Sequence, residues 1–329
     1  MKVAIIGLGV IGAVHAELIV NRGDELTALC DVDPAVLASA QDKWAKDAHL
    51  YTDYKDMLAK EALDVVHICT PHYLHTEMIV EALAHNVNTL CEKPLCIRHE
   101  DIDRILAAEE SSSAILGVCH QNRYLASNLF AMEYLKDKEL RAAHGSVVWH
   151  RDAAYYASGA WRGKWETEGG GSLINQALHT LDLTMWFSGD PESALATAAN
   201  LTLKDEIEVE DTIFARFAGK VPFTFLGTNV SVADMPVEIT LRLADGTVLT
   251  VLPSTMLING VPVPSATTKK TAHGKECYGS GHEALIDDFH TCVAEGRHFP
   301  IDGREGARVI RLILAAYESA RENKEVKIK

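Results

Sequence analysis

The sequence predicts an α/β protein of two domains, from its length, a glycine fingerprint near its start, and the alternation of strand-like and helix-like runs that follows. The chain has 329 residues, and domains usually hold about 100–200 residues each. Its content of 47% hydrophobic and 23% charged residues is typical of a globular protein with a large core. We predict a doubly wound parallel sheet, followed by an α+β domain with a largely antiparallel, open-faced sheet.

The net charge limits the classes of partner that we expect, and the cysteines indicate the cellular compartment. The formal net charge is −15, which repels phosphate backbones and anionic lipids, so we expect neither nucleic acid nor a membrane as partner. The seven cysteines form no CxxC pair and are odd in number. We therefore expect reduced thiols and a cytoplasmic protein. They are Cys30, Cys69, Cys91, Cys96, Cys119, Cys277 and Cys292.

The apolar run over residues 3–20 resembles a signal or membrane segment, because it spans 18 residues after Lys2. Three glycines interrupt it, however, and His15 and Glu17 stand where such a segment is apolar. No small-residue cleavage site stands out. We expect no targeting role for it and no membrane span elsewhere.

A dinucleotide fingerprint opens the chain. Residues 2–6 read as a buried strand, Gly7, Gly9 and Gly12 form G-x-G-x-x-G, and a helix is expected from residue 11 to about 21. The first glycine makes a tight turn, the second admits a pyrophosphate, and the third lets helix and strand pack closely. A second strand ends at Asp31, whose carboxylate suits ribose hydroxyls and repels a 2′-phosphate. A Rossmann domain that binds NAD rather than NADP is the prediction.

Further strand–helix units continue to residue 122, where we place the end of the Rossmann domain (1–122). Residues 123–329 then form a substrate-binding and oligomerisation domain. Strands are expected at 145–151, 211–217, 222–228, 237–243 and 247–252, with a hairpin turn at Asp245-Gly246. Two further helices close the chain. The sheet of this domain should cover helices with one face and meet solvent or another subunit with the other.

A polar line follows the glycine triplet at 169–171. Asn175, His179 and Asp182 are separated by four and then three residues, which places them on one face of a continuous helix. The triplet would let the chain pass close to another body, and the cofactor is the body we expect. Outside an enzyme, His179 would be an ordinary core histidine and Asn175 a capping residue.

Six stretches together resemble the Gfo/Idh/MocA oxidoreductases, the family of glucose-fructose oxidoreductase and inositol dehydrogenase. They are "VAIIGLGVIGAVHAELI", "CTPHYLH", "CEKPL", "HQNRY", "WRGKWETEGGGSLINQALHTLD" and the closing "DG…AAYESA". The resemblance implies hydride transfer between NAD(P) and a secondary alcohol of a sugar, sugar acid or cyclitol. It also implies a homodimer or homotetramer formed through the C-terminal sheet.

The resemblance assigns roles to matching residues. His179 corresponds to the family's catalytic histidine and would be the general base, with Asp182 orienting it or binding a substrate hydroxyl. Lys93, at the end of a Rossmann strand, would hold the substrate oxygen and stabilise an alkoxide, and Glu92 would touch the nicotinamide-side ribose. Inositol dehydrogenase-like members carry an aspartate where this chain has Asn175, which puts inositol itself in doubt as the substrate.

The remaining candidate residues fall into two sets. For the cofactor we predict Gly7, Gly9, Val10, Ile11, Gly12, Asp31, Thr70, Pro71, His75, Glu92, Lys93 and Gln121. For the substrate we predict Lys93, Arg123, Tyr124, Trp161, Arg162, Asn175 and His179. Trp161 and Trp165 are either sugar-stacking or core residues, and Arg123 and Arg162 contact either substrate or cofactor. His72 and His75 have a spacing compatible with a metal, but no metal is predicted.

Two other functions stay open at this point. An NAD-assisted glycosidase or lyase would use the same residues with no net redox change. A non-catalytic NAD-sensing binder would not need Lys93 or His179, and both are present.

Overall fold

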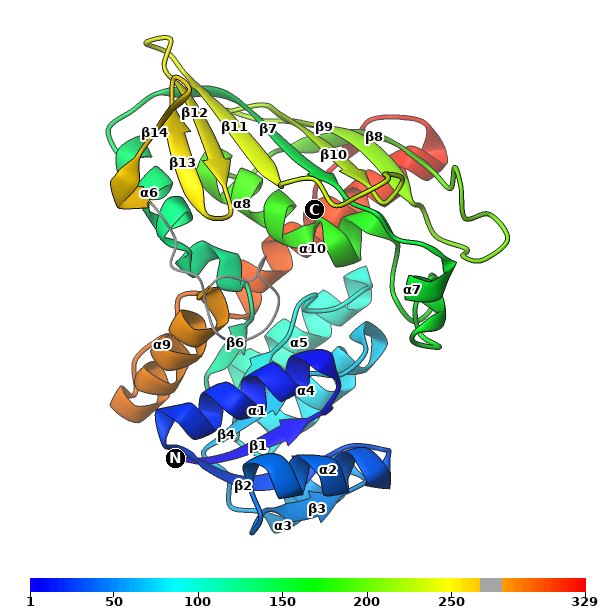
Figure 1. Ribbon diagram of the computed structural model, residues 1–329, viewed down its shortest axis with the longest axis vertical. Helices are drawn as coiled ribbons and strands as arrows, with labels where there is room; N and C mark the ends of the chain where they lie inside the picture. The colour runs from blue at the N-terminus through cyan, green and yellow to red at the C-terminus, as the bar shows by residue number, and fades with distance from the viewer. Residues whose placement is uncertain (267–279) are drawn as a thin grey trace. The chain divides into compact units, whose positions relative to one another are not determined.

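The computed structural model describes residues 1–266 and 280–329 and divides the chain into two compact units (Figure 1). The first unit contains Met1–His120 and His282–Ala307, and the second contains residues 121–266, 280–281 and Arg308–Lys329. Cys277 lies outside the described residues, and the six described cysteines form no disulfide. Among the described residues, no helix is long and apolar enough to cross a membrane.

The first unit is built on a parallel six-stranded sheet of order β3-β2-β1-β4-β5-β6. The strands are β1 (Lys2–Ile6), β2 (Glu25–Cys30), β3 (His49–Tyr51), β4 (Val65–Ile68), β5 (Asn88–Cys91) and β6 (Leu116–Val118). In register, Ile6 pairs with both Cys30 and Ile68, so β1, β2 and β4 end at one edge. The strand order reverses between β1 and β4, and ligands bind at such a switch point. The predicted doubly wound fold is confirmed.

The helices of the first unit are α1 (Val10–Arg22), α2 (Pro34–Trp44), α3 (Tyr54–Lys60), α4 (His75–Ala84), α5 (His99–Ser111) and most of α9 (Gly281–Glu295), with the short turn η1 (His72–Leu74). Our division at residue 122 assigned α9 to the other domain. The structure packs it against β6, where an added Cβ on Gly117 would lie 2.7 Å from the ring of Phe289. Local periodicity predicts such a helix but not the sheet that it covers.

The second unit is built on a nine-stranded sheet of order β14-β13-β12-β11-β7-β10-β9-β8-β15. The strands are β7 (Leu140–Val148), β8 (Ser193–Ala199), β9 (Thr212–Ala218), β10 (Phe223–Thr228), β11 (Glu238–Leu243), β12 (Val248–Leu252), β13 (Thr255–Ile258), β14 (Val261–Pro262) and β15 (Val326–Lys327). Only the β7–β10 pair is parallel among these described strands. The largely antiparallel sheet is confirmed, and so is the hairpin, in which Gly246 has φ 88°.

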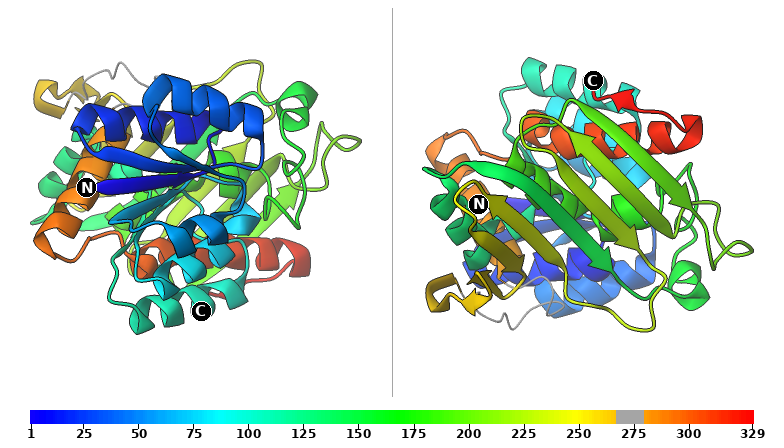
Figure 2. Two further views of the ribbon diagram at one scale, coloured as in Figure 1. Left: turned by 90° about the horizontal axis from the view of Figure 1, so that it is seen from below. Right: turned by 90° about the horizontal axis from the view of Figure 1, so that it is seen from above.

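One face of this sheet carries helices. They are η2 (Gln121–Tyr124), α6 (Ala126–Leu135), α7 (Ala153–Ala157), the π-helical turn Ser172–Gln176, α8 (Leu178–Ser188), η4 (Pro264–Ala266) and the C-terminal part of α10 (Gly303–Glu322). The right-hand view of Figure 2 shows the opposite face, and no described helix lies in front of it. That face exposes Leu195 by 41% and Phe214 by 58%.

Candidate active site

The glycine turn of the first unit has the shape that a pyrophosphate site needs. Gly7 has φ +88°, and a Cβ there would lie 2.6 Å from the Cys69 carbonyl oxygen. A Cβ on Gly12 would overlap the Gly7 carbonyl. Gly9 differs, because no heavy atom lies within 4 Å of its ideal Cβ, and it precedes α1 without a side-chain cap. The helix N-terminus therefore meets open space at the point where backbone amides can receive an anion.

Asp31 follows β2 at the same edge of the sheet. Its carboxylate accepts hydrogen bonds from the backbone amides of Leu8 (2.8 Å) and Asp33 (3.0 Å), which hold it beside the glycine turn. Val10 and Val32 flank it with exposed fractions of 76% and 86%. Exposed apolar side chains beside a held carboxylate fit an adenosine, with the ring on the valines and the ribose on the acid. These residues therefore fit NAD.

His75 connects two turns at the ends of β4 and β5. Its Nδ1 lies 2.7 Å from the Pro94 carbonyl oxygen, and its Nε2 lies 2.9 Å from the Thr70 carbonyl oxygen. The Lys93–Pro94 peptide bond is cis, and Lys93 is half-buried in this turn. The predicted cofactor residues Thr70, Pro71 and His75 and the predicted catalytic lysine therefore share one strand-end cluster in the first unit.

Glu92 is oriented differently from our expectation. Its Oε1 lies 3.1 Å from His15 Nε2 and 3.3 Å from His282 Nε2, and its Oε2 accepts from the Lys93 amide at 3.1 Å. Burial acts to raise the pKa of Glu92, but the hydrogen bonds from the two histidines dominate and hold it well below its usual range. The carboxylate is therefore an anion inside the unit, and its contact with the nicotinamide-side ribose stays a prediction.

His72 and His75, the pair whose spacing is compatible with a metal, have different surroundings. Both ring nitrogens of His75 face carbonyl oxygens, and the ring of His72 lies 6.1 Å from it. His15, Glu92 and Cys119 also bring one donor atom each within 4.8 Å of one another. Hydrogen bonds to the Glu92 carboxylate bring these atoms together.

The glycine triplet in the second unit packs against that unit's own core. A Cβ on Gly170, where φ is +148°, would overlap the Tyr317 hydroxyl, and one on Gly171 would overlap the Glu210 carbonyl oxygen. The buried Glu210 carboxylate accepts from the amides of Gly171 (2.8 Å) and Leu173 (2.9 Å). The close approach of the triplet to the cofactor stays a prediction.

Glu210 is a residue that sequence reasoning missed. Its side chain is buried and also accepts from the Tyr317 hydroxyl at 2.9 Å. Burial raises the pKa of Glu210 to about 7, although the amide and hydroxyl donors oppose this shift. The only signal in the sequence was the acidic pair Glu210-Asp211 before an alternating strand, which does not show that either acid is buried.

The polar line after the triplet does not lie on one regular helix. Ser172–Gln176 form a π-helical turn in which the Ala177 amide donates to the Ser172 carbonyl at 2.8 Å, and α8 starts only at Leu178. Offsets of four and seven therefore do not bring the three side chains onto one face. Asn175 donates from Nδ2 to the buried Glu168 at 2.5 Å. Such turns recur at functional sites because they re-aim side chains.

His179 and Asp182 have separate partners. His179 is half-buried, and its Nε2 lies 3.1 Å from Nε2 of Gln121, which donates to it. Asp182 is buried and forms a two-pronged ion pair with Arg123, at 2.7 Å (Nε–Oδ2) and 2.5 Å (Nη2–Oδ1). Both Gln121 and Arg123 belong to η2. Asp182 therefore holds η2 in place, and η2 carries Gln121, the hydrogen-bond partner of His179.

The aromatic candidates gather around Tyr155, which the sequence analysis did not select. Arg162 donates to the Tyr155 hydroxyl at 2.6 Å, and its guanidinium lies 4.5 Å from the ring centres of both Tyr155 and Trp161. Asn175 also reaches that hydroxyl, at 3.4 Å. Trp165 lies apart from this group, donates to the Glu208 carbonyl and is 43% exposed. Tyr124 is half-buried in η2.

Comparison with known proteins identifies the class first. Residues 1–120 match the NAD-binding Rossmann domain of the Gfo/Idh/MocA oxidoreductases, and residues 138–328 match the C-terminal α/β domain of the same family. The chain belongs to the Gfo/Idh/MocA family of oxidoreductases.

Its relatives have several activities. An inositol 2-dehydrogenase of Salmonella typhimurium is 34% identical over 114 residues, which is 34% of each chain. A D-glucoside 3-dehydrogenase of Escherichia coli is 30% identical over 197 residues, 58% of this chain and 55% of that one. A 2,7-anhydro-N-acetylneuraminate hydratase of Mediterraneibacter gnavus is 24% identical over 220 residues, 64% of this chain and 56% of that one. The matches span about a third to a little over half of the length of these curated relatives.

A solved structure matches the whole chain. The WlbA dehydrogenase of Bordetella pertussis, in complex with NADH and UDP-GlcNAcA, is similar with a TM-score of 0.86 and 27% identity, over 100% of this chain and 98% of that one. Levoglucosan dehydrogenase in complex with NADH and levoglucosan gives a TM-score of 0.85 at 18% identity, over 100% and 99% of the two chains, which shows a shared fold.

Proposed function

We propose that the protein is an NAD-dependent dehydrogenase that transfers a hydride between nicotinamide and a secondary alcohol of a sugar, sugar acid or cyclitol. The observation that supports this most directly is the glycine turn with Gly9 in open space and Asp31 held beside it by two amides. The family and the dehydrogenases among its relatives support the reaction class. A cytoplasmic location remains the expectation from the cysteines.

The proposal gives each catalytic residue one task. When bound, NAD accepts the hydride from the alcohol carbon. Lys93 holds the alcohol oxygen with its ammonium and stabilises the negative charge that develops there. His179 takes the hydroxyl proton, because an imidazole is half-protonated near neutral pH and suits that exchange. Gln121 donates to His179 Nε2, which is therefore the nitrogen without a proton, and the substrate hydroxyl takes the place of Gln121 there when it gives up its proton.

Other residues would bind the polyol. Asn175 and Arg162 both contact Tyr155 and present amide and guanidinium donors to sugar hydroxyls. Trp161 stacks on Arg162, and an indole face is a good platform for a sugar ring. Asn175 can donate and accept hydrogen bonds but cannot take a proton. We therefore propose a substrate other than inositol.

A second candidate function is supported by the relatives. The M. gnavus hydratase and a glycosyl hydrolase family 109 protein of Shewanella baltica, which is 26% identical over 189 residues, 53% of this chain and 41% of that one, belong to the same group of matches. Such a reaction would move a hydride to NAD and return it, with no net oxidation. A non-catalytic NAD-sensing binder would turn over no member of a sugar panel.

One experiment separates these functions. The protein is incubated with NAD⁺ and a panel of polyols, sugar acids, nucleotide sugars and glycosides, and both NADH absorbance and carbohydrate products are followed. A dehydrogenase produces NADH in proportion to product. Product without NADH supports transient redox chemistry, and binding of NAD⁺ with no product on any substrate supports a sensor.

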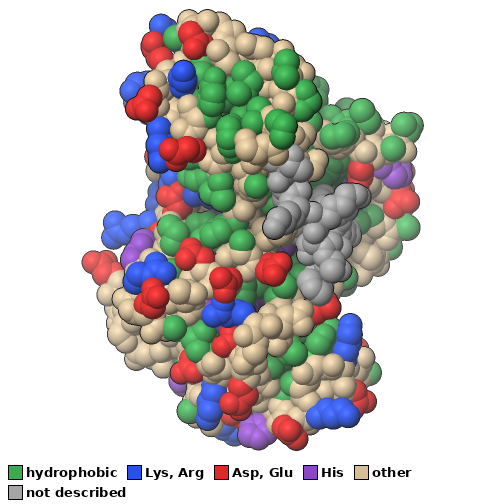
Figure 3. Space-filling model, turned by 60° about the vertical axis from the view of Figure 1, so that its left-hand side comes forward, with side chains coloured by type: hydrophobic (Ala, Val, Ile, Leu, Met, Phe, Trp, Pro, Cys, Tyr) green, Lys and Arg blue, Asp and Glu red, His purple; other side chains and the backbone are tan. Residues whose placement is uncertain are grey.

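We also propose a homodimer or homotetramer formed through the open sheet face. Leu195 and Phe214 are exposed on neighbouring strands β8 and β9. Figure 3 shows hydrophobic side chains gathered over the second unit on another side of the molecule. A light-scattering mass equal to one chain at micromolar concentration would refute this assembly.

A further inference from the structure

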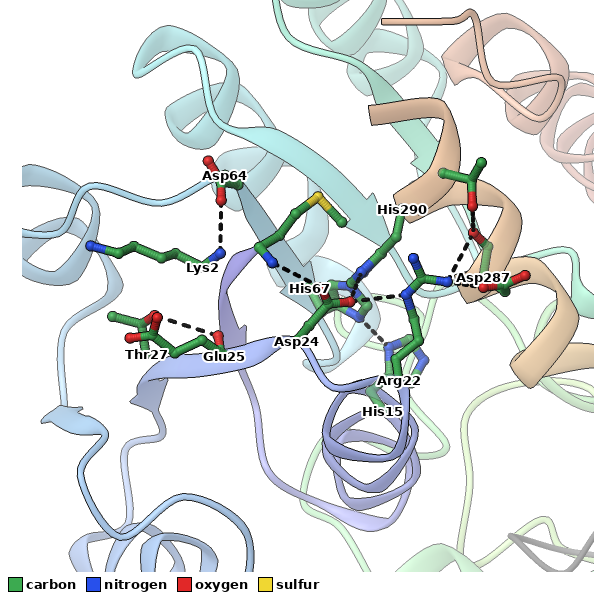
Figure 4. Close-up of polar contacts among 12 residues, drawn as sticks. Lys2, His15, Arg22, Asp24, Glu25, Thr27, Asp64, His67, Asp287 and His290 are labelled. Atoms are coloured by element: carbon green, nitrogen blue, oxygen red, sulfur yellow. Dashed lines mark hydrogen bonds and ion pairs between the residues drawn. The ribbon is translucent and has the colours of Figure 1, made fainter. Parts of the chain in front are cut away.

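A chain of buried polar side chains runs through the first unit from Glu92 to Asp24, and Figure 4 shows its outer part. Glu92 Oε1 lies 3.1 Å from His15 Nε2, and His15 Nδ1 lies 2.8 Å from His67 Nδ1. His67 Nε2 lies 2.8 Å from His290 Nε2, and His290 Nδ1 lies 2.8 Å from Asp24 Oδ2. The three imidazoles come from α1, β4 and α9 and have no exposed surface.

Counting protons shows what is unusual about these contacts. Each contact of this length needs one proton between its two atoms, so the four contacts need four protons. The two terminal carboxylates are acceptors, and a neutral imidazole carries one proton, so three neutral rings supply three. One contact then lacks a proton, and the tautomers of the rings decide which one it is.

The charge states favour three neutral rings at neutral pH. Burial lowers the pKa of His15 and holds that of His67 well below its usual range. Burial also lowers the pKa of His290 to about 4, although the Asp24 carboxylate opposes this. The two carboxylates stay ionised, because hydrogen bonds lower the pKa of Asp24 to about 2 against the effect of its burial, and that of Glu92 well below its usual range.

The two ends of the chain differ in their surroundings. At the inner end, Glu92 faces His282 of α9 and lies near the thiols of Cys69, Cys91 and Cys119, whose pKa values are raised by burial first and by this carboxylate second. At the outer end, Asp24 binds the Met1 ammonium and Arg22, and Arg22 pairs with Asp287, which is 65% exposed. The outer end therefore meets solvent, whereas the inner end lies beside Lys93.

We propose that the chain Glu92–His15–His67–His290–Asp24 is a store for one exchangeable proton, filled from water at Asp24 and presented at Glu92. Before the extra proton enters, His290 carries its proton on Nε2, His67 on Nδ1 and His15 on Nε2. The contact between His290 Nδ1 and Asp24 is then the one that lacks a proton. A proton from water binds to His290 Nδ1, and His290 passes its Nε2 proton to His67 Nε2. His67 passes its Nδ1 proton to His15 Nδ1, so His15 becomes an imidazolium that keeps its Nε2 proton and donates it to the Glu92 carboxylate. The reverse sequence returns one proton to water.

The use of this store rests on the proposed dehydrogenase function. Oxidation of an alcohol releases one proton and reduction of a ketone consumes one. Glu92 precedes Lys93, so the positive charge that arrives on His15, the hydrogen-bond partner of Glu92, alters the electrostatic environment of the lysine. The store itself is a property of the first unit and can be measured without any substrate.

The test uses nitrogen-15 NMR of the histidine rings in the intact protein, titrated from pH 8 to pH 4. We expect His15, His67 and His290 to take up one proton in a single shared step, with one midpoint for all three rings. Three different midpoints, or rings that do not respond while the protein stays folded, would overturn the proposal. Elemental analysis showing one tightly bound metal ion per chain, with ring shifts of metal-bound nitrogen, would also overturn it.

Two variants and a control sharpen this test. Asp24→Asn removes the outer anion and should lower the shared midpoint by about one pH unit or more, including the midpoint read at the distant His15. A change at His290 alone would contradict the store. His67→Gln interrupts the path and should shift the ring nitrogens of both neighbours already at pH 7.5, and unchanged neighbours would also contradict it. His298→Gln removes an exposed histidine of the same unit and should leave the midpoint unchanged.

Failure of the store and failure of the proposed function give different results. If the rings titrate independently while NADH is produced from a sugar, only the store is refuted. If the rings share one step while no substrate is oxidised, the store remains and its catalytic use is refuted.

Discussion

Arg123 and Asp182 form a two-pronged ion pair inside the second unit, with exposed side-chain fractions of 5% and 1%. The pair joins η2 to α8, and η2 also carries Gln121, the hydrogen-bond partner of His179. The aspartate that we expected to act on the catalytic histidine directly is therefore in a position to act on it through two residues of η2.

Asp182→Asn should lower stability and also kcat. The substitution leaves the Arg123 guanidinium buried without its anion, which typically costs about 3–5 kcal/mol. Denaturant unfolding measures the first effect, and kcat on the best substrate, with an unchanged NAD⁺ affinity, measures the second. Asp56→Asn is the matched control, because its ion pair with Lys60 is solvent-exposed and should contribute about 0–1 kcal/mol. Equal losses in the two variants would refute the positioning role.

Gly170→Ala should destabilise the second unit much more than Gly246→Ala. Both glycines have positive φ, at +148° and +88°, so both alanines are strained. Only the first would also overlap another group, the Tyr317 hydroxyl, whereas nothing lies within 4 Å of the second. We expect about 1 kcal/mol for Gly246→Ala and a loss several times larger for Gly170→Ala. Similar unfolding midpoints would show that the tyrosine can move aside.

The parts of the fold that the sequence predicts are those with a local signal. The order strand, glycines, helix, strand and Asp31 needs only neighbouring residues, and the structure shows each of these elements. The short strand β3 and the strands β8 and β13 to β15 were missed, because two to seven residues with little alternation give a weak signal. The assignment of α9 to the first unit depends on the contact of Phe289 with β6, which is 172 residues away in sequence.

In the candidate site, too, the sequence predicts only the residues that have a local signal. Lys93 and His179 could be selected because they lie in recognisable motifs, but their roles stay predictions. The partners of the site residues were invisible, since Glu210, Glu168 and Tyr155 lie 7 to 39 residues away from Gly171 or Asn175, which they bind. The π-helical turn was missed for a different reason: spacing arguments assume 3.6 residues per turn, and the extra residue in Ser172–Gln176 changes the direction of every later side chain.

Glu210 should make the second unit less stable as pH rises from about 4.5 to 7. Its pKa is about 7 in the folded protein and is 4.5 ordinarily, so in this range the folded state holds a proton that the unfolded chain releases. The sign follows from linkage: the state that binds more protons is favoured at low pH. The difference corresponds to about 3 kcal/mol across the range.

Glu210→Gln should remove this pH dependence, because the amide does not titrate. Hydrogen exchange of the β9 and β10 amides between pH 5 and pH 8, corrected for intrinsic rates, measures it. Glu208→Gln is the control, since its carboxylate is exposed on the surface two residues away and its loss should keep the wild-type slope. A variant at Glu210 with the wild-type slope would assign the pH dependence to another group.

His290 should act in the opposite direction on the first unit. Its pKa is lowered from 6.5 to about 4, so the unfolded chain binds a proton in this range that the folded state does not. Stability is then complete above pH 6.5 and falls as pH drops towards 4, by about 3 kcal/mol in total. Hydrogen exchange of the β1 and β4 amides in wild type and His290→Gln measures this. A slope that survives the substitution would contradict the assignment.

Asp31 should decide between the two nicotinamide cofactors. NAD⁺ should bind at least about tenfold more tightly than NADP⁺, because a carboxylate beside a 2′-phosphate easily costs about 1.4 kcal/mol. Asp31→Ser should reduce this preference while keeping a side-chain acceptor for the Leu8 and Asp33 amides. Titration calorimetry with both cofactors measures the ratio. Equal affinities in the wild-type protein would refute the role of the acid.

The division of work between Lys93 and His179 is tested by kcat as a function of pH. His179→Ala should lower kcat by about 10²–10⁴-fold and remove the near-neutral limb of the profile, because the titrating base is gone. NAD⁺ affinity should hardly change, since Gly9 and Asp31 belong to the first unit and are untouched. Lys93→Ala should lower kcat while keeping the limb that His179 produces.

Asn175→Asp replaces a neutral amide of the candidate site with a carboxyl group. Asn175 contacts the Glu168 carboxylate at 2.5 Å, so an aspartate there faces a buried anion and should raise the pKa of one of the two carboxyls. Gln121→Leu removes the donor to His179 Nε2 and should lower kcat more than it changes KM. If His179→Ala keeps the wild-type kcat and its acidic limb, His179 is not the base, and its bond to Gln121 is a structural contact.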